Sequence, residues 1–140
     1  MRKKAILDSG FLYAVIDSGD RNHLRVEQAL SAVTEQILLP VLVVVEVCYL
    51  LAARLGHSTM RQCVRQLADS PLELISILPA DLPLIHELLE KYADLKLDFT
   101  DAAIVTLAER LDIQKILTVD LRDFGTIRPK YCPHFDIIPA

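Results

Sequence analysis

The sequence predicts a three-layer α/β domain, in which helices cover both faces of a central, mostly parallel sheet of four to five strands. Short aliphatic segments alternate along the chain with longer segments of helical periodicity, as expected of successive β-α-β units. The chain has 140 residues, and 52% of them are hydrophobic, which is enough to bury a core. We therefore expect one folded domain that spans residues 1–140.

The chain begins with a candidate strand and two candidate helices. Residues 5–7 form an apolar run that Asp8 ends, as is typical of a buried strand, and a short helix is expected over 11–16. Apolar residues at near-helical spacing predict a second helix over 21–33, and Asp20 is placed to cap it.

A long apolar segment follows the second candidate strand, residues 37–39. Its valines favour a strand, but the run continues to Gly56 and is too long for one. We therefore predict a helix with Pro40 in its first turn and Gly56 as its C-terminal cap. Ser58 is the expected N-cap of the next helix, which ends at Ala68.

The second half of the chain continues the alternation of strands and helices. Strands are expected over residues 72–78, 116–119 and 135–138, and helices over 81–93 and 99–111. The order of these elements predicts parallel strands connected by helical crossovers.

Composition argues against several classes of protein. The chain carries 15 Lys+Arg and 19 Asp+Glu, a formal net charge of −4, so binding of nucleic acid requires a local basic patch. Cys48, Cys63 and Cys132 are far apart and lack metal-ligand spacing, which argues against a disulfide framework and a zinc site. The longest apolar run contains Pro40 and Glu46 and is too short to span a membrane, so we expect a cytoplasmic protein without a membrane partner.

Two acidic residues follow predicted strands directly. Asp8 ends the first strand and Asp120 the fourth, and the carboxyl ends of parallel strands form the ligand-binding edge of such a sheet. The two carboxylates face each other there if the first and fourth strands are neighbours. Each residue taken alone is equally well explained as a turn former.

Glu46 is the only fully charged side chain between Gln36 and Arg54. A buried carboxylate destabilises the fold unless a cation or a hydrogen-bond network compensates it. A metal ion at the sheet edge is one interpretation. A salt bridge to Arg54 or Arg110, or a solvent-facing position, is the other.

Three further acids lie near the predicted edge. Asp98 and Asp101 open a helix, where one acid needs no explanation beyond capping and the helix dipole. Asp101 precedes two alanines that allow close helix packing and could direct its carboxylate to the same edge. Asp123 is either a fifth carboxylate or part of a turn that begins at Asp120.

Carboxylates gathered at one point repel one another, and a divalent cation removes this repulsion. Mg²⁺ and Mn²⁺ suit such a set because they prefer hard oxygen ligands. A site of this kind supports metal-assisted hydrolysis of phosphodiester bonds.

Four segments of the sequence resemble, in order, the acidic motifs of PIN domains. They cover nearly the whole chain and comprise residues 6–14, 40–47, 98–104 and 117–124. The resemblance implies a PIN-like α/β/α fold and a ribonuclease, in particular a VapC-like toxin of a toxin–antitoxin pair.

The resemblance also implies which residues form the site. The metal-binding and catalytic acids would be Asp8, Glu46, Asp101 and Asp120, with Asp98 and Asp123 as further acids. Ser9 and Thr118 occupy positions of small hydroxyl residues, where they would orient carboxylates. Our leading hypothesis is an endoribonuclease that requires Mg²⁺ or Mn²⁺. Arg122, the basic residue nearest in sequence to an acid of the candidate site, is the candidate RNA contact.

Two partner proteins follow from the resemblance: an antitoxin that blocks the site, and a second copy of the chain in a homodimer. Helices around Leu50–Leu51 and Leu88–Leu89 are apolar enough for both core and interface, and a place in the core is the simpler explanation.

Two alternative functions remain at this stage. A receiver-like phosphoacceptor requires paired acids after the first strand, whereas here Ser9 follows Asp8, and an acceptor Asp after the third, whereas residues 72–78 lead to Pro79. The other alternative is a catalytically silent PIN fold that binds a protein partner, which only an assay distinguishes from the enzyme.

Overall fold

Five strands form one all-parallel sheet. A computed structural model describes residues 3–130 and 134–139. The strand order is β3-β2-β1-β4-β5, so β1 is the central strand and pairs with β2 on one side and with β4 on the other. The predicted parallel sheet is confirmed, with every described pair parallel. The bounds are Lys4–Leu7 for β1, Gln36–Pro40 for β2, Glu73–Ile75 for β3, Lys115–Leu117 for β4 and Asp136–Ile138 for β5.

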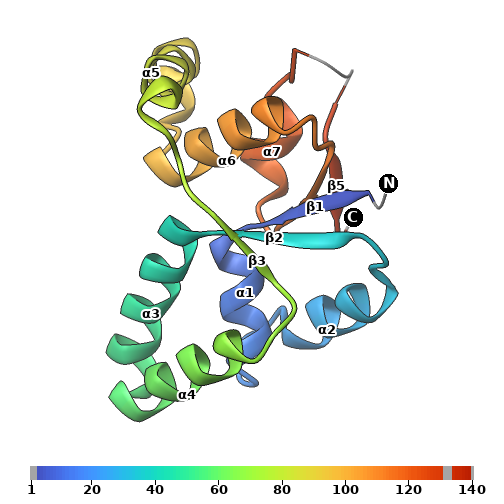
Figure 1. Ribbon diagram of the computed structural model, residues 1–140, viewed down its shortest axis with the longest axis vertical. Helices are drawn as coiled ribbons and strands as arrows, with labels where there is room; N and C mark the ends of the chain where they lie inside the picture. The colour runs from blue at the N-terminus through green and yellow to red at the C-terminus, as the bar shows by residue number, and fades with distance from the viewer. Residues whose placement is uncertain (1–2, 131–133, 140) are drawn as a thin grey trace.

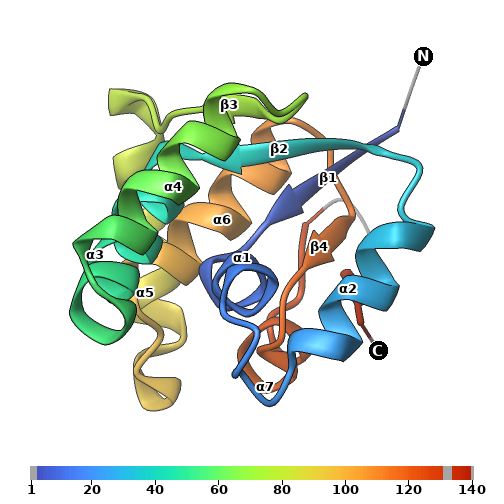
Figure 2. The ribbon, with the colours of Figure 1, turned by 90° about the horizontal axis from the view of Figure 1, so that it is seen from below.

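Helices cover both faces of this sheet, which confirms the three-layer prediction (Figure 1). Helices α1 to α4 lie on one side, and α5 to α7 lie on the other. Seen from below, α1 lies between α2 and the pair α3 and α4 (Figure 2). The bounds are Ser9–Ile16 for α1, His23–Ala32 for α2, Val41–Leu55 for α3, His57–Ala68 for α4, Leu82–Lys91 for α5, Phe99–Arg110 for α6 and Leu121–Thr126 for α7.

The boundary between β2, α3 and α4 differs from the prediction at two residues. Pro40 is the last residue of β2 and the N-cap of α3, and its backbone is extended rather than helical. Gly56 alone connects α3 to α4. Its φ is 99°, a backbone conformation that residues other than glycine rarely adopt. Helix α4 therefore begins at His57, and the prediction of Ser58 as its N-cap is wrong.

Other predicted boundaries are too wide. Strand β3 has only three residues, and a 3₁₀ turn over Pro79–Asp81 precedes α5. Helix α2 begins after Asp20, whose carboxylate accepts a hydrogen bond from the Asn22 amide instead of capping the helix. The segment after Asp120, for which a turn was one of two interpretations, is helix α7.

The core lies on both faces of β1 and β4. Ile6, Ile116 and Leu117 are fully buried, and so are Phe11 of α1 and Ile104 of α6. In the described part of the chain, none of the helices has the length and apolarity that crossing a membrane requires. The two described cysteines are free thiols, one half-buried on α3 and the other buried on α4, while Cys132 lies outside the described residues.

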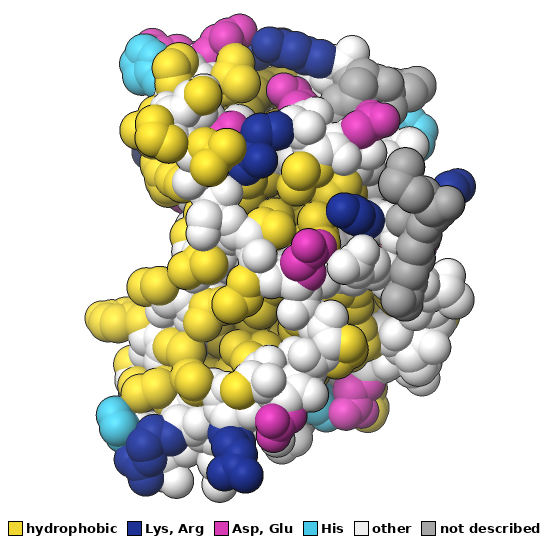
Figure 3. Space-filling model, viewed as in Figure 1, with side chains coloured by type: hydrophobic (Ala, Val, Ile, Leu, Met, Phe, Trp, Pro, Cys, Tyr) yellow, Lys and Arg dark blue, Asp and Glu magenta, His cyan; other side chains and the backbone are white. Residues whose placement is uncertain are grey.

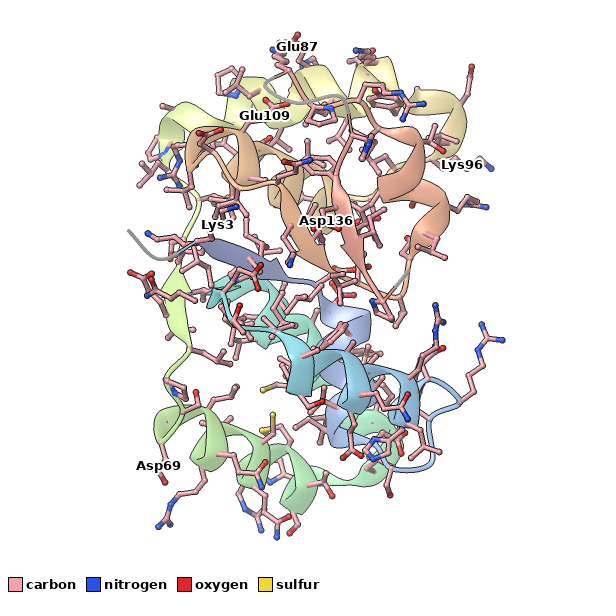
Figure 4. All side chains as sticks on the ribbon, turned by 90° about the vertical axis from the view of Figure 1, so that its right-hand side faces the viewer. Lys3, Asp69, Glu87, Lys96, Glu109 and Asp136 are labelled. Carbon is pink, nitrogen blue, oxygen red and sulfur yellow. The ribbon has the colours of Figure 1, made fainter. Side chains whose placement is uncertain are left out.

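The amino edge of the sheet carries an ion-pair cluster. Lys115 Nζ lies 2.5 Å from Glu35 Oε2 and 3.7 Å from Asp136 Oδ2. Figure 4 shows Asp136 on β5 and places Glu87 and Asp69 at opposite ends of the molecule. Asp8 and Asp120 lie at the opposite edge, beyond the carboxyl ends of β1 and β4.

Candidate metal centre

Strands β1 and β4 are neighbours, so the acids that follow them come together. The Asp8 amide donates to the Leu117 carbonyl over 2.9 Å. Thr118, which is fully buried, donates its hydroxyl to Asp8 Oδ2 over 2.7 Å and accepts from the Asp120 amide over 2.9 Å. One threonine hydroxyl thus links the two acids.

Three helices begin at this edge, each with an aspartate as its N-cap. Asp8 accepts from the Ser9 amide over 2.8 Å, Asp98 from the Asp101 amide over 2.8 Å, and Asp120 from the Asp123 amide over 3.1 Å. The amino ends of α1 and α6 carry partial positive charge. This charge partly offsets the repulsion among the acids, which helps the fold to hold them together.

Asp101, Asp120 and Asp123 form a cluster that could hold a metal ion. Each offers a carboxylate oxygen, and these oxygens lie within 4.8 Å of one another. Asp101 and Asp123 are buried, and Asp120 is half-buried. An all-oxygen, anionic donor set fits a hard divalent cation. Asp98 is exposed and lies outside this cluster, as an N-cap of α6.

The surroundings of these acids destabilise their charged, deprotonated form and so raise their pKa values. Burial raises the pKa of Asp8 to about 6, with smaller contributions from the charges of Glu46 and Asp120. Burial also holds the pKa of Asp101 well above its usual range, and the charges of Asp8 and its other acidic neighbours add to this. Burial also raises the pKa of Asp120. Such a site is stabilised by any bound cation.

Glu46 is compensated by hydroxyl groups. Its Oε1 accepts from the Ser9 hydroxyl over 3.1 Å, and its Oε2 accepts from the Thr100 hydroxyl over 3.0 Å. The proposed arginine partners have other contacts: Arg54 lies over the Tyr13 ring and Arg110 pairs with Asp81.

Thr100 was not identified from the sequence. Its only signal there is its position directly before Asp101, in the first turn of a helix.

Arg122 lies beside the acidic cluster. Its Nε is 3.4 Å from Asp123 Oδ1, and its side chain is 78% exposed. This guanidinium group therefore remains accessible to an anionic ligand at the edge of the cluster.

Together the all-parallel sheet and its clustered carboxylates define an α/β domain with an acidic edge that could hold a cation. The chain belongs to the PIN domain family, whose family model matches residues 5–128. It is also 31% identical over 134 residues to Ribonuclease VapC26 of Mycobacterium tuberculosis, an alignment that covers 96% of this chain and 99% of the relative.

Solved structures show the same fold. The sarcin-ricin loop cleaving toxin VapC20 of Mycobacterium tuberculosis aligns with a TM-score of 0.78 at 17% identity, over 84% of this chain and 91% of that one. A toxin-antitoxin complex from Klebsiella pneumoniae aligns with a TM-score of 0.66 at 24% identity, over 94% of this chain and 98% of that one.

Proposed function

We propose that the protein is an endoribonuclease that requires Mg²⁺ or Mn²⁺ and hydrolyses RNA phosphodiester bonds. The observation that carries this proposal is the cluster of Asp101, Asp120 and Asp123 at the carboxyl edge of the sheet, in a chain of the PIN domain family. A bound Mg²⁺ or Mn²⁺ ion would supply Lewis-acid stabilisation of the charge that develops on the phosphate.

The residues of the site have distinct roles in this proposal. The three clustered aspartates would hold the metal, and Asp8 and Glu46, which the family resemblance also assigns to the metal, would complete its acidic ligands. One of the carboxylates at this edge would accept the proton of the attacking water. Arg122 binds a phosphate of the RNA backbone through its exposed guanidinium group.

Cleavage of defined RNAs by the purified protein tests this function. We expect cleavage with Mg²⁺ or Mn²⁺, none with EDTA, and none in the Asp101→Asn variant, whose fold is checked by circular dichroism. Retained metal-dependent cleavage in that variant would rule out the proposed site. If the wild-type protein binds Mn²⁺ but cleaves no RNA, the catalytically silent alternative holds.

We further propose that the protein is the toxin of a toxin–antitoxin pair and acts on RNA in the cytoplasm. Support comes from the similarity to the VapC ribonuclease and from the fold shared with toxins solved in complex with antitoxins. Expression should arrest growth, and co-expression of the neighbouring gene product should restore it. Growth arrest that Asp101→Asn leaves unchanged would contradict a nuclease toxin.

A homodimer is the second proposed assembly, and helix α3 offers the surface for it. Hydrophobic side chains gather over α3 and α5 on the face seen in Figure 3. Val45 and Tyr49 are 65% and 73% exposed, whereas Leu51 and Leu88, two of the residues named from the sequence, are buried in the core. The proposed interface is therefore the exposed side of α3 that carries Val45 and Tyr49, the outer stripe of this helix.

A further inference from the structure

The contacts of Glu46 carry an inference about Thr100. The Glu46 carboxylate is bound on both oxygens by hydroxyls from two other helices, Ser9 at the start of α1 and Thr100 at the start of α6. Glu46 itself lies on α3, so three helices meet at this one side chain. The Ser9 amide also donates to Asp8, which connects Glu46 to the acids at the strand ends.

The Thr100 hydroxyl has no part in starting its own helix. The N-cap of α6 is Asp98, which accepts the Asp101 amide. Thr106, on the same helix, behaves differently: it is fully buried and its hydroxyl donates to the Ala102 carbonyl one turn earlier. The Thr100 hydroxyl is instead directed to a carboxylate 54 residues away in sequence.

Glu46 requires such a restraint because its carboxylate lies close enough to Asp8 for the two groups to repel each other. Its charge acts on Asp8, and it is half-buried, so its flexible side chain can swing toward water to relieve the repulsion. A hydrogen bond to a carboxylate is stronger than one between neutral groups, and two of them fix the plane of the carboxylate. Each oxygen keeps a second lone pair for another ligand.

We propose that Thr100 is a positioning residue, which holds the Glu46 carboxylate beside Asp8 at the acidic edge so that metal and RNA phosphate meet a preformed site. This inference rests on the proposed function for its catalytic readout, but the metal-binding readout is independent of that function. Because residues that orient metal-site ligands change metal affinity or activity substantially, we expect an effect of about 10-fold.

Three variants of the full chain test the proposal. Thr100→Val removes the hydroxyl at nearly constant shape, Thr100→Ser keeps it, and Thr106→Val makes the same change elsewhere on α6. Mn²⁺ affinity is measured by electron paramagnetic resonance, and kcat and KM are measured for RNA cleavage. We expect Thr100→Val to weaken Mn²⁺ binding about 10-fold and to lower kcat more than it raises KM. Thr100→Ser should restore both, and Thr106→Val should change neither.

Three results would overturn the proposal. One is a Thr100→Val protein that binds Mn²⁺ as the wild type does. Another is a folded Thr100→Ser protein that fails to restore binding. The third is an equal loss in Thr106→Val, which would indicate a general effect on the helix. If wild-type protein binds Mn²⁺ but cleaves no RNA, the proposed function fails while the affinities still decide the role of Thr100. Wild-type protein that binds no Mn²⁺ overturns both.

Discussion

The pKa values of Asp8 and Asp101 are raised, because burial and neighbouring charges both oppose ionisation of these carboxyl groups. The raised pKa means that the folded protein binds these protons more tightly than the unfolded chain does. Stability from this source is present at low pH and is lost as pH rises through the raised pKa. For Asp8, a change from 3.8 to about 6 corresponds to about 3 kcal/mol.

Stability of the metal-free protein should therefore fall as pH rises from about 4, through about 6 for Asp8 and on to about 9 for Asp101. Asp101→Asn removes one charge from the cluster, so its melting temperature in EDTA should fall less over this range than that of the wild type. Mg²⁺ should restore the wild-type melting temperature at neutral pH and have little effect on the variant. Parallel melting curves for the two proteins at every pH would contradict this explanation.

Thr118 provides a second prediction at the residue scale. Thr118→Val keeps the shape of a fully buried side chain, but it removes a donor from Asp8 and leaves the Asp120 amide without its acceptor. We expect a loss of about 1–3 kcal/mol in the free energy of unfolding, measured with urea.

The matched variant Thr118→Ser retains the hydroxyl and should lose less. It would lose as much as the valine variant only if packing of the threonine methyl group, rather than the hydrogen bonds, were the main contribution.

Helix α1 closely approaches Val119, which follows β4, at Gly10, the residue next to Ser9. A Cβ atom at Gly10 would lie 2.9 Å from Val119 Cγ2, whereas a Cβ atom at Gly125 on α7 would meet nothing within 4 Å. Valine is branched at Cβ and cannot easily rotate away. The close approach thus depends on the absence of a side chain.

Gly10→Ala should destabilise the protein by about 1–3 kcal/mol and weaken Mn²⁺ binding, because α1 must move away from β4. Gly125→Ala is the matched control, and it should be neutral or slightly stabilising, since alanine favours a helix. Thermal unfolding and Mn²⁺ titration check both variants. The double variant Gly10→Ala with Val119→Ala should recover part of the loss, and no recovery would show that the steric explanation is wrong.

Elements with a clear hydrophobic period could be predicted from the sequence, and their ends could not. The valine-rich helix α3 was assigned correctly because its length excludes a strand. The start of α4 was misplaced because Ser58 is a good N-cap by type, whereas the backbone reversal at Gly56 already starts the helix at His57. Helix α7 was not predicted, and a turn was one of the interpretations of its first residues, because an aspartate at its start favours either structure.

At the scale of the whole molecule, the candidate site depends on strand order, which local sequence does not encode. Pairing of β1 with β4 brings Asp8 to the Thr118 hydroxyl across 110 residues of sequence. The acids could be proposed because each ends a strand or begins a helix. The donors to Glu46 are 37 and 54 residues away, and only the packing of α1, α3 and α6 identifies Thr100 as one of them.

The outer stripe of α3 leads to a prediction about assembly. Val41, Val45 and Tyr49 follow one another at four-residue spacing on the exposed side of this helix, and they are 40%, 65% and 73% exposed. An exposed apolar stripe without charges can pair with its own copy about a twofold axis, because no like charges are brought together. We therefore expect a dimer by light scattering after gel filtration.

Tyr49→Asp should convert this dimer to a monomer, because the new charge would be buried next to its symmetry-related copy. Leu24→Asp is the matched control: Leu24 is also 73% exposed but lies on α2, away from the stripe, and this variant should remain dimeric. If Tyr49→Asp stays dimeric, the interface lies elsewhere on the surface. If the wild-type chain is monomeric and the stripe becomes protected only when the antitoxin is added, the apolar surface of α3 binds the antitoxin instead.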